Sequence, residues 1–146
     1  MLRGNAPARI DDKGRLKVPN AFRSLLESKY GRELFVTSVT GEFVRIYPMP
    51  VWIDIERRLG GAPSTHPAKL RFLDRVNYFG QAGELDGQGR VLIPVRLREA
   101  ATMAGDVDVL GVYNYLDVWN HERFLAKLHR EPFTDDDARA LSDLGI

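Results

Sequence analysis

The chain mixes two patterns of apolar residues. Short segments in which apolar and polar residues alternate predict β-strands, and longer segments with apolar residues at helical spacing predict helices. We expect strands at residues 34–39, 43–47, 77–84, 107–112 and 115–119. We expect helices at 20–29 and 95–103, around 52–59, from 67, from 120 to 131 and from 134. Short strands at turn spacing, with glycine at the reversals and helices between them, predict an α+β fold that is mainly β.

One ten-residue pattern occurs twice, as IDDKGRLKVP at residues 10–19 and as LDGQGRVLIP at residues 85–94, which is 75 positions later. In both copies an aspartate leads, glycine and arginine follow three and four residues on, and proline closes the pattern. Arg23 and Arg98 also lie at the same offset. We interpret the chain as one unit written twice, each copy being strand, turn, strand and helix.

The turn in each copy has residues suited to a tight reversal. Gly14 and Gly89 can adopt a positive φ without steric cost. Asp11 and Asp86 can accept backbone N–H groups inside the turn and can also hold the arginine four residues on. We therefore assign these four residues to the ordering of the two loops.

Two of the predicted helices carry apolar faces that we expect to be buried. In the helix from residue 67, Leu70, Leu73 and Val76 can face the core. In the helix from residue 120, which Asn120 can cap, the expected buried side chains are Phe124, Leu125 and Leu128.

The repeat predicts a barrel shared between two halves. A half of about seventy residues has exposed strand edges and a thin core, so the halves should pair their sheets across a pseudo-twofold axis, with helices outside. We place the first half at residues 1–64, a connecting helix at 65–78, the second half at 79–132 and an acidic C-terminal helix or tail at 133–146.

Composition limits the class of protein. The 146 residues fit one domain or two interleaved halves, and 44% hydrophobic residues can form a packed core. There is no apolar run of membrane-spanning length, no signal-peptide pattern and no cysteine, so we expect a cytosolic protein.

Charge is unevenly distributed although the net charge is only +1. Residues 1–32 carry eight Lys and Arg against three Asp and Glu, a net +5, whereas residues 131–146 carry one Arg against five acids, a net −4. The basic segment can attract phosphates or can simply be a solvated face. The acids at 135–137 suit the N-terminus of a helix better than a metal site.

Motifs for catalysis or cofactors are absent. The sequence contains no phosphate-binding glycine loop, no dinucleotide fingerprint and no nucleophile elbow. The second turn resembles the start of a calcium loop, but Arg90 and Leu97 occupy positions where that loop needs oxygen ligands. The three histidines have no metal-site spacing. We expect no catalytic residue, no metal and no cofactor.

The remaining candidates are the two arginines just past the turns. Arg15, with Lys13, Lys17, Arg3 and Arg9 around it, could meet the major groove of DNA and grip guanine bidentately. The alternative is that Arg15 and Arg90 each pair with their own aspartate and only stiffen a turn.

The doubled turn, with its LKVP and VLIP flanks, resembles the MraZ family of bacterial transcription regulators. The opening Met-Leu-Arg-Gly, the passage from Tyr47 to Trp52 and the ending from Leu116 to Trp119 also resemble it. The resemblance implies two AbrB-like swapped-hairpin halves in one chain. It also implies a DNA-facing surface comprising Arg15, Lys13, Lys17, Arg3, Arg90 and Gln88.

The resemblance further implies a sequence-specific transcriptional regulator that is cytoplasmic and nucleoid-associated. Such a regulator binds short direct repeats of double-stranded DNA, upstream of the division and cell-wall gene cluster, as a ring of about eight or more subunits. Because Gln88 and Leu92 replace Lys13 and Lys17, we expect the first loop to carry most DNA contact and the second to lie nearer a subunit boundary. Two alternatives stay open: a ring-forming interaction module that does not read DNA, and an enzyme that uses Asp11 or Asp86.

Overall fold

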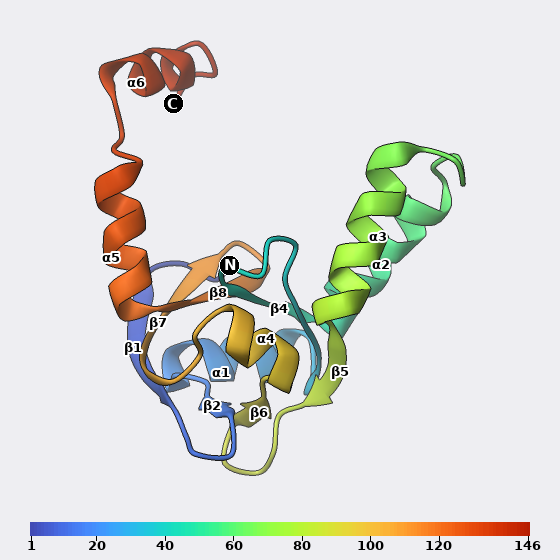
Figure 1. The fold of residues 1–146 in the computed structure, drawn as a ribbon, viewed down its shortest axis with the longest axis vertical. Coiled ribbons are helices and arrows are strands. Elements are labelled where there is room, and N and C mark those ends of the chain that lie inside the picture. Colours follow the sequence, from blue (N-terminus) through green and yellow to red (C-terminus); the bar gives the residue numbers. More distant parts are fainter.

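The protein forms one eight-stranded antiparallel sheet that curls into a nearly closed barrel (Figure 1). The computed structural model describes residues 1–146. The first half contributes β1 (Asn5–Ile10), β2 (Arg15–Lys17), β3 (Glu33–Thr37) and β4 (Val44–Pro48). The second half contributes β5 (Gln81–Glu84), β6 (Arg90–Leu92), β7 (Gly105–Val112) and β8 (Tyr115–Asn120).

The strand order interleaves the two halves, running β5-β3-β4-β8-β7-β1-β2-β6. Strand β1 pairs along its length with β7 of the other half, and β5 pairs with β3 in the equivalent way. Strand β2 pairs with its own counterpart β6, and β4 with its counterpart β8. The pseudo-twofold axis therefore passes between β2 and β6 and between β4 and β8, as the sequence repeat predicts.

Six helices pack against the sheet or project from it. They are α1 (Asn20–Lys29), α2 (Met49–Gly60), α3 (Pro67–Phe79), α4 (Val95–Ala100), α5 (His121–Arg130) and α6 (Asp135–Ser142). Helices α1 and α4 follow Pro19 and Pro94 and bury Phe22, Leu26 and Leu97 in the core between the sheet and the helices. The α2–α3 hairpin projects from one side of the barrel and α5–α6 from the other (Figure 1). None of these helices is both long and apolar enough to cross a membrane.

Two element boundaries differ from the sequence-based expectation. The segment predicted as a strand at 77–84 is helical as far as Phe79, because the apolar spacing of α3 continues past Val76. Strand β5 begins only at Gln81. The helix predicted at 95–103 ends at Ala100, because Thr102 adopts a φ of +53° and the backbone N–H of Met103 donates to the carbonyl of Arg98.

Two expectations of burial were wrong. Leu70 on α3 is 47% exposed, although Val76 is buried. On α5, Leu125 and Leu128 are 48% and 53% exposed, because the helix extends away from the barrel and only its first turns touch β7 and β8. The predicted caps do form: Asn120 accepts from the N–H of Arg123, and Thr134 makes a capping box with Asp137.

An ion pair lies on the pseudo-twofold axis where β4 meets β8. Arg45 is opposite Asp117 and donates to both of its carboxylate oxygens, at 2.8 and 3.1 Å. The guanidinium also lies over the rings of Phe43 and Tyr115. Partial burial acts to lower the pKa of Arg45, but the hydrogen bonds and charge of Asp117 outweigh it and hold that pKa above its usual value.

We predict that Asp117→Ala destabilises the protein, because it leaves a half-buried guanidinium without its counter-ion. The free energy of unfolding should fall by about 2 kcal/mol, which is less than for a fully buried pair because the Arg45 side chain retains some water contact. Urea denaturation would measure the change. The matched control is Asp54→Ala, which breaks exposed pairs with Arg57 and Arg58 and should cost less than about 0.5 kcal/mol. Equal losses in the two variants would contradict a structural role for the axial pair.

Candidate nucleic-acid interface

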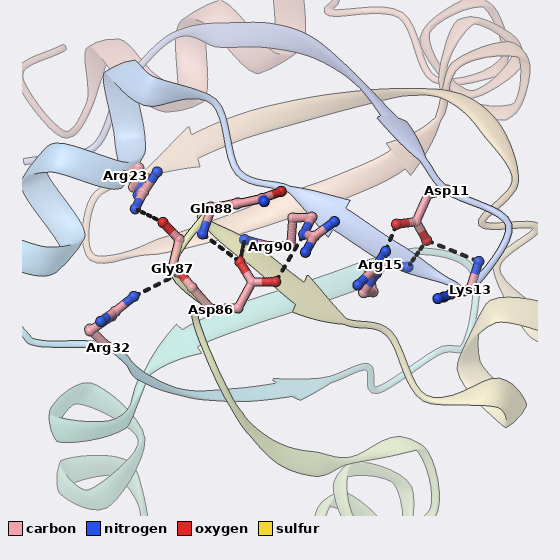
Figure 2. A network of polar contacts seen from close by, with 9 residues as sticks. All are labelled: Asp11, Lys13, Arg15, Arg23, Arg32, Asp86, Gly87, Gln88 and Arg90. Atoms are coloured by element: carbon pink, nitrogen blue, oxygen red, sulfur yellow. Dashed lines mark hydrogen bonds and ion pairs between the residues drawn. The ribbon is translucent and has the colours of Figure 1, made fainter.

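Each repeat turn is closed by its aspartate. Asp11 Oδ1 accepts from the backbone N–H groups of Lys13 and Arg15, at 3.0 and 2.9 Å, and Asp11 Oδ2 accepts from Arg15 Nε at 2.8 Å. The second turn repeats this arrangement with Asp86, Gln88 and Arg90 at 2.8 to 2.9 Å (Figure 2). The chain reverses at Gly14 and Gly89, whose φ angles are +80° and +75°.

These hydrogen bonds stabilise the charged form of both aspartates. The backbone N–H of Arg90 is the largest influence that lowers the pKa of Asp86, to about 2, and the N–H of Gln88 and the Arg90 guanidinium act in the same direction. The backbone N–H of Arg15 likewise lowers the pKa of Asp11. Both turns therefore hold a carboxylate that remains ionised far below neutral pH.

The two arginines are neither enclosed nor fully free. Their side chains are 29% exposed in Arg15 and 27% exposed in Arg90. Each gives its Nε to its own aspartate, and neither guanidinium donates a hydrogen bond from its Nη atoms within the chain. The outer edge of each guanidinium thus keeps the two nitrogens that an incoming acceptor would need.

Strand pairing brings the two turns together on one ribbon. Strands β2 and β6 pair with Arg15 opposite Leu92, Leu16 opposite Val91 and Lys17 opposite Arg90. The central pair is buried, and because side chains alternate along a strand the other four residues share the outer face. We call this surface the ribbon face: Arg15, Lys17, Arg90 and Leu92. It presents three cations from one two-stranded antiparallel ribbon.

The structure does not bring every predicted residue to this surface. Lys13 and Gln88 are exposed at the tips of the first and second turns. Arg3, however, lies at the far end of β1 beside Tyr113, about 20 Å along the strand from the first turn. The expected clustering of Arg3 with Arg15 was therefore wrong, because β1 runs straight along β7 instead of folding back. Arg9 pairs with Asp106 at 3.4 Å.

Each turn is also covered by an arginine from the other half, a contact that the sequence analysis did not predict. Arg23 lies over Gly89, and Arg98 lies over Gly14, where an added Cβ would overlap each guanidinium. The carbonyl of each turn glycine accepts an N–H from the opposite half, from Val18 and from Ile93, both at 2.9 Å. The shared offset of Arg23 and Arg98 was the one sequence signal that could have revealed this crossing.

The second turn is held more firmly than the first. Arg23 donates to the carbonyl of Gly87 at 3.3 Å, and Arg32 donates to the carbonyl of Asp86 at 2.7 Å (Figure 2). Glu27 accepts a hydrogen bond from Arg23 Nε at 3.0 Å and so holds the Arg23 guanidinium in place beside the turn.

The first turn lacks these anchors, because Arg98, the counterpart of Arg23, makes no hydrogen bond or ion pair there. Arg98 Nε is buried without a hydrogen-bond partner. It lies beside an open hollow of about 430 Å³ that is also lined by Asp11, Asp12 and Glu99. No three His, Asp or Glu side chains gather as a metal site here or elsewhere.

We predict that Asp86→Asn lowers the melting temperature in a pH-dependent way. Because folding depresses the pKa of Asp86 to about 2, its contribution is complete above its unfolded pKa near 4 and is lost as pH falls through 2. The melting-temperature gap between wild type and variant should therefore be widest at pH 6 and should narrow between pH 4 and 2, as followed by circular dichroism. Asp12→Asn is the control, since Asp12 makes no hydrogen bond in the turn. A gap that stays constant with pH would contradict this account.

Comparisons with known proteins show which family the chain resembles. The chain matches the family model described as "MraZ protein, putative antitoxin-like" over residues 1–75 and 80–144. It is 47% identical over 146 residues to the transcriptional regulator MraZ of Acidobacterium capsulatum, and 49% identical over 147 residues to that of Koribacter versatilis. Both alignments cover 100% of each chain. The protein of the same name from Chromobacterium violaceum is 36% identical over 85% of this chain and 84% of its own.

Each of the two matched regions contains one copy of the repeat, and the alignments with the first two relatives run over the full length of both chains. The names of these relatives denote regulators of transcription and not enzymes, in keeping with the expectation from the sequence. The chain belongs to the MraZ family of transcriptional regulators.

Proposed function

We propose that this protein regulates transcription by binding short direct repeats of double-stranded DNA, with the ribbon face and the first turn as its contact surface. The observation that carries the proposal is the set of three outward-facing cations, Arg15, Lys17 and Arg90, on one antiparallel ribbon. In this proposal the DNA lies upstream of the division and cell-wall gene cluster, including the protein's own gene, and the protein is cytoplasmic and nucleoid-associated. Membership of a family of transcriptional regulators supports the regulatory role.

The ribbon suits the major groove in size and chemistry. A two-stranded ribbon fits within that groove, where guanine presents two acceptors that a guanidinium can bind at once. The Nη atoms of Arg15 and Arg90 have no partners within the chain, so this bidentate contact costs no internal hydrogen bond. Lys17 and Lys13 are exposed and can neutralise phosphates on either side.

The aspartates prepare the arginines for binding. A free arginine side chain loses considerable rotamer entropy when it is fixed against a base. Asp11 already holds the Nε of Arg15 at 2.8 Å and thereby fixes most of the side chain. The two ideas that the sequence left open, an arginine that stiffens its turn and an arginine that reaches outward, are compatible in this geometry.

The two turns should contribute unequally. The first turn carries Lys13 at its tip and lacks the backbone anchors that Arg23 and Arg32 supply to the second. It can therefore adjust to the groove, and we assign it most of the DNA contact. The second turn has Gln88 at its tip and Leu92 beside it, and we place it nearer a boundary between subunits.

Several copies acting together would give useful affinity. One small ribbon offers few contacts, but copies fixed in a ring on regularly spaced repeats gain through effective concentration. We propose a homo-oligomeric ring of about eight or more subunits. In each subunit the halves at 1–64 and 79–132, joined by the helix at 65–78, form one ribbon, and the segment at 133–146 stays outside the DNA surface.

We predict that Arg15→Ala weakens binding to repeat-bearing promoter DNA by about 5- to 150-fold, the range of 1–3 kcal/mol for loss of a bidentate base contact. Binding to a shuffled sequence should change much less. Arg15→Lys separates the two roles, since lysine keeps the charge but cannot make the paired hydrogen bonds. Mobility shifts with promoter and shuffled DNA would measure these effects. The control is Arg57→Ala, an equal charge change on exposed α2, and Arg15→Ala that binds as tightly as this control would move the contact elsewhere.

We predict that Lys17→Ala reduces the salt dependence of binding. A lysine that neutralises one phosphate contributes about one unit to the slope of log affinity against log salt, and its removal should weaken specific and non-specific DNA alike. Fluorescence anisotropy at several salt concentrations between 50 and 200 mM, the range over which such contacts are most visible, would give the slope. An assembly that ignores DNA at every salt concentration would favour the interaction-module alternative.

A further inference from the structure

The C-terminal helices expose an apolar surface that the rest of the chain does not cover. We call residues 121–146, which comprise α5 and α6, the arm. Five of the thirteen large exposed hydrophobic residues of the protein lie in it: Leu125, Leu128, Phe133, Leu144 and Ile146, at 48% to 80% exposure. No residue of either helix is buried. The density of bare apolar side chains in this segment points to a missing partner.

The sequence nevertheless specifies these helices strongly. Asn120 caps α5, and a capping box formed by Thr134 and Asp137 starts α6. On α5, Phe124, Leu125 and Leu128 share one stripe. Phe124 packs on the barrel with its ring 5.4 Å from that of Trp119, whereas Leu125 and Leu128 are 48% and 53% exposed. Helices of 10 and 8 residues are marginal in water without tertiary packing. An apolar stripe on a capped helix indicates that another protein surface buries this stripe.

A second surface with complementary features lies on α3. At 100° per residue, the outward side of this helix carries Leu70, Arg71, Arg75 and Tyr78, and we call these four residues the α3 face. Leu70 is 47% exposed and Tyr78 is 57% exposed. At the end of α3, a groove of about 460 Å³ continues this surface toward α4 and is lined by Tyr78, Val95 and Arg96. The guanidinium of Arg96 lies 4.4 Å above the Tyr78 ring, and Val95 is 60% exposed.

The two surfaces have opposite charge. The end of the arm, residues 131–146, carries a net −4, with Asp135, Asp136 and Asp137 at the first turn of α6. The α3 face and its groove carry Arg71, Arg75 and Arg96, with Asp74 and Glu99 as the acids beside them. Apolar centres edged by opposite charges are the usual composition of a protein interface.

The arm cannot reach the α3 face of its own chain. Figure 1 shows α5 and α6 on one side of the barrel and the α2–α3 hairpin on the other, both projecting in the same direction. A neighbour placed beside the molecule and rotated by a modest angle about a shared axis brings its arm next to this hairpin. Such a contact joins two different surfaces, so every copy has one of each to offer, and a repeated rotation closes it into a ring.

We infer that the arm of one copy packs against the α3 face of the next copy, with Leu125, Leu128 and Phe133 on Leu70, Tyr78 and Val95, and with the acids of α6 facing the arginines. This inference rests on the ring assembly of the proposed function and names the surfaces that would build it. The partner that covers the exposed apolar surface of the arm is thus a second copy of this chain.

Cross-linking can test the pairing, because the chain contains no cysteine. Leu128→Cys and Tyr78→Cys place one thiol on each surface at side chains that are exposed in the single chain. When the two variants are co-expressed with different tags and oxidised, a disulfide-linked heterodimer should form in good yield. Each variant alone should remain unlinked. Leu128→Cys paired with Glu42→Cys, an exposed position on the β3–β4 loop, is the control and should give no link. Efficient self-linking of Leu128→Cys, or an equal yield with the control, overturns the inference.

The mass of the assembly gives a second measurement. Light scattering should show that the double change Leu125→Ser and Leu128→Ser reduces the ring to single chains or small fragments, while circular dichroism shows an intact barrel. Val39→Ser, at a side chain that is 39% exposed elsewhere, should leave the ring unchanged. A ring that survives the double change overturns the inference but leaves the proposed function standing. A wild-type protein that is monomeric overturns the ring and the inference together. A wild-type ring that fails to bind DNA contradicts the proposed DNA binding but neither the ring nor the inference.

Discussion

The structure depends on hydrogen bonding between strands of different halves. Neither half can form the sheet alone, since β1 finds its long partner in β7, and β3 requires β5 to cover its second edge. Unpaired edges in water would be sites of aggregation. Because both halves belong to one chain, each half has its partner available and the barrel forms within a single molecule. The ribbon that we propose as the DNA surface exists only because β2 and β6 meet there, one strand from each half.

Fusion of the two copies also allows residues on the pseudo-twofold axis to differ. In a symmetric homodimer, a residue on the axis faces its own copy, so a charge there would face an identical charge. Here Arg45 faces Asp117 across β4 and β8, and the two form a bidentate pair. The same freedom lets one turn be anchored by Arg23 and Arg32 while the other remains open beside Arg98. The asymmetry of the turns is therefore possible because equivalent positions of the two copies carry different residues in one chain.

Much of the local structure could be predicted from the sequence. The duplicated turn, the hairpins β3–β4 and β7–β8 and the caps at Asn120 and Thr134 follow from local rules that involve residues within a few positions. Alternation and turn chemistry do not determine which strand pairs with which, and the interleaved order had to be inferred from the thin core of each half and from family resemblance.

The errors have a common physical origin. Apolar periodicity predicts that one face of a helix is buried, but it does not predict which surface covers that face. For this reason the sequence analysis placed Leu125 and Leu128 in the core of their own chain. The end of α4 depends on the left-handed conformation of Thr102, which an ordinary threonine rarely adopts. The crossing of Arg23 and Arg98 onto the opposite turns involves contacts between segments more than sixty residues apart, as in the bond from Arg23 to Gly87, and no local pattern encodes it.

The Asp–Arg pairs show how one interaction can serve both folding and recognition. The aspartate accepts two backbone N–H groups, which shapes the turn, and its second oxygen takes the arginine Nε. Because guanidinium is planar, fixing the Nε also fixes the direction in which both Nη atoms point. The bond that lowers the conformational freedom of the side chain thus leaves its recognition edge open, and a ligand that binds there meets a group already ordered by the fold. A lysine at the same position could pair with the aspartate, but its single nitrogen would then have no second edge to present.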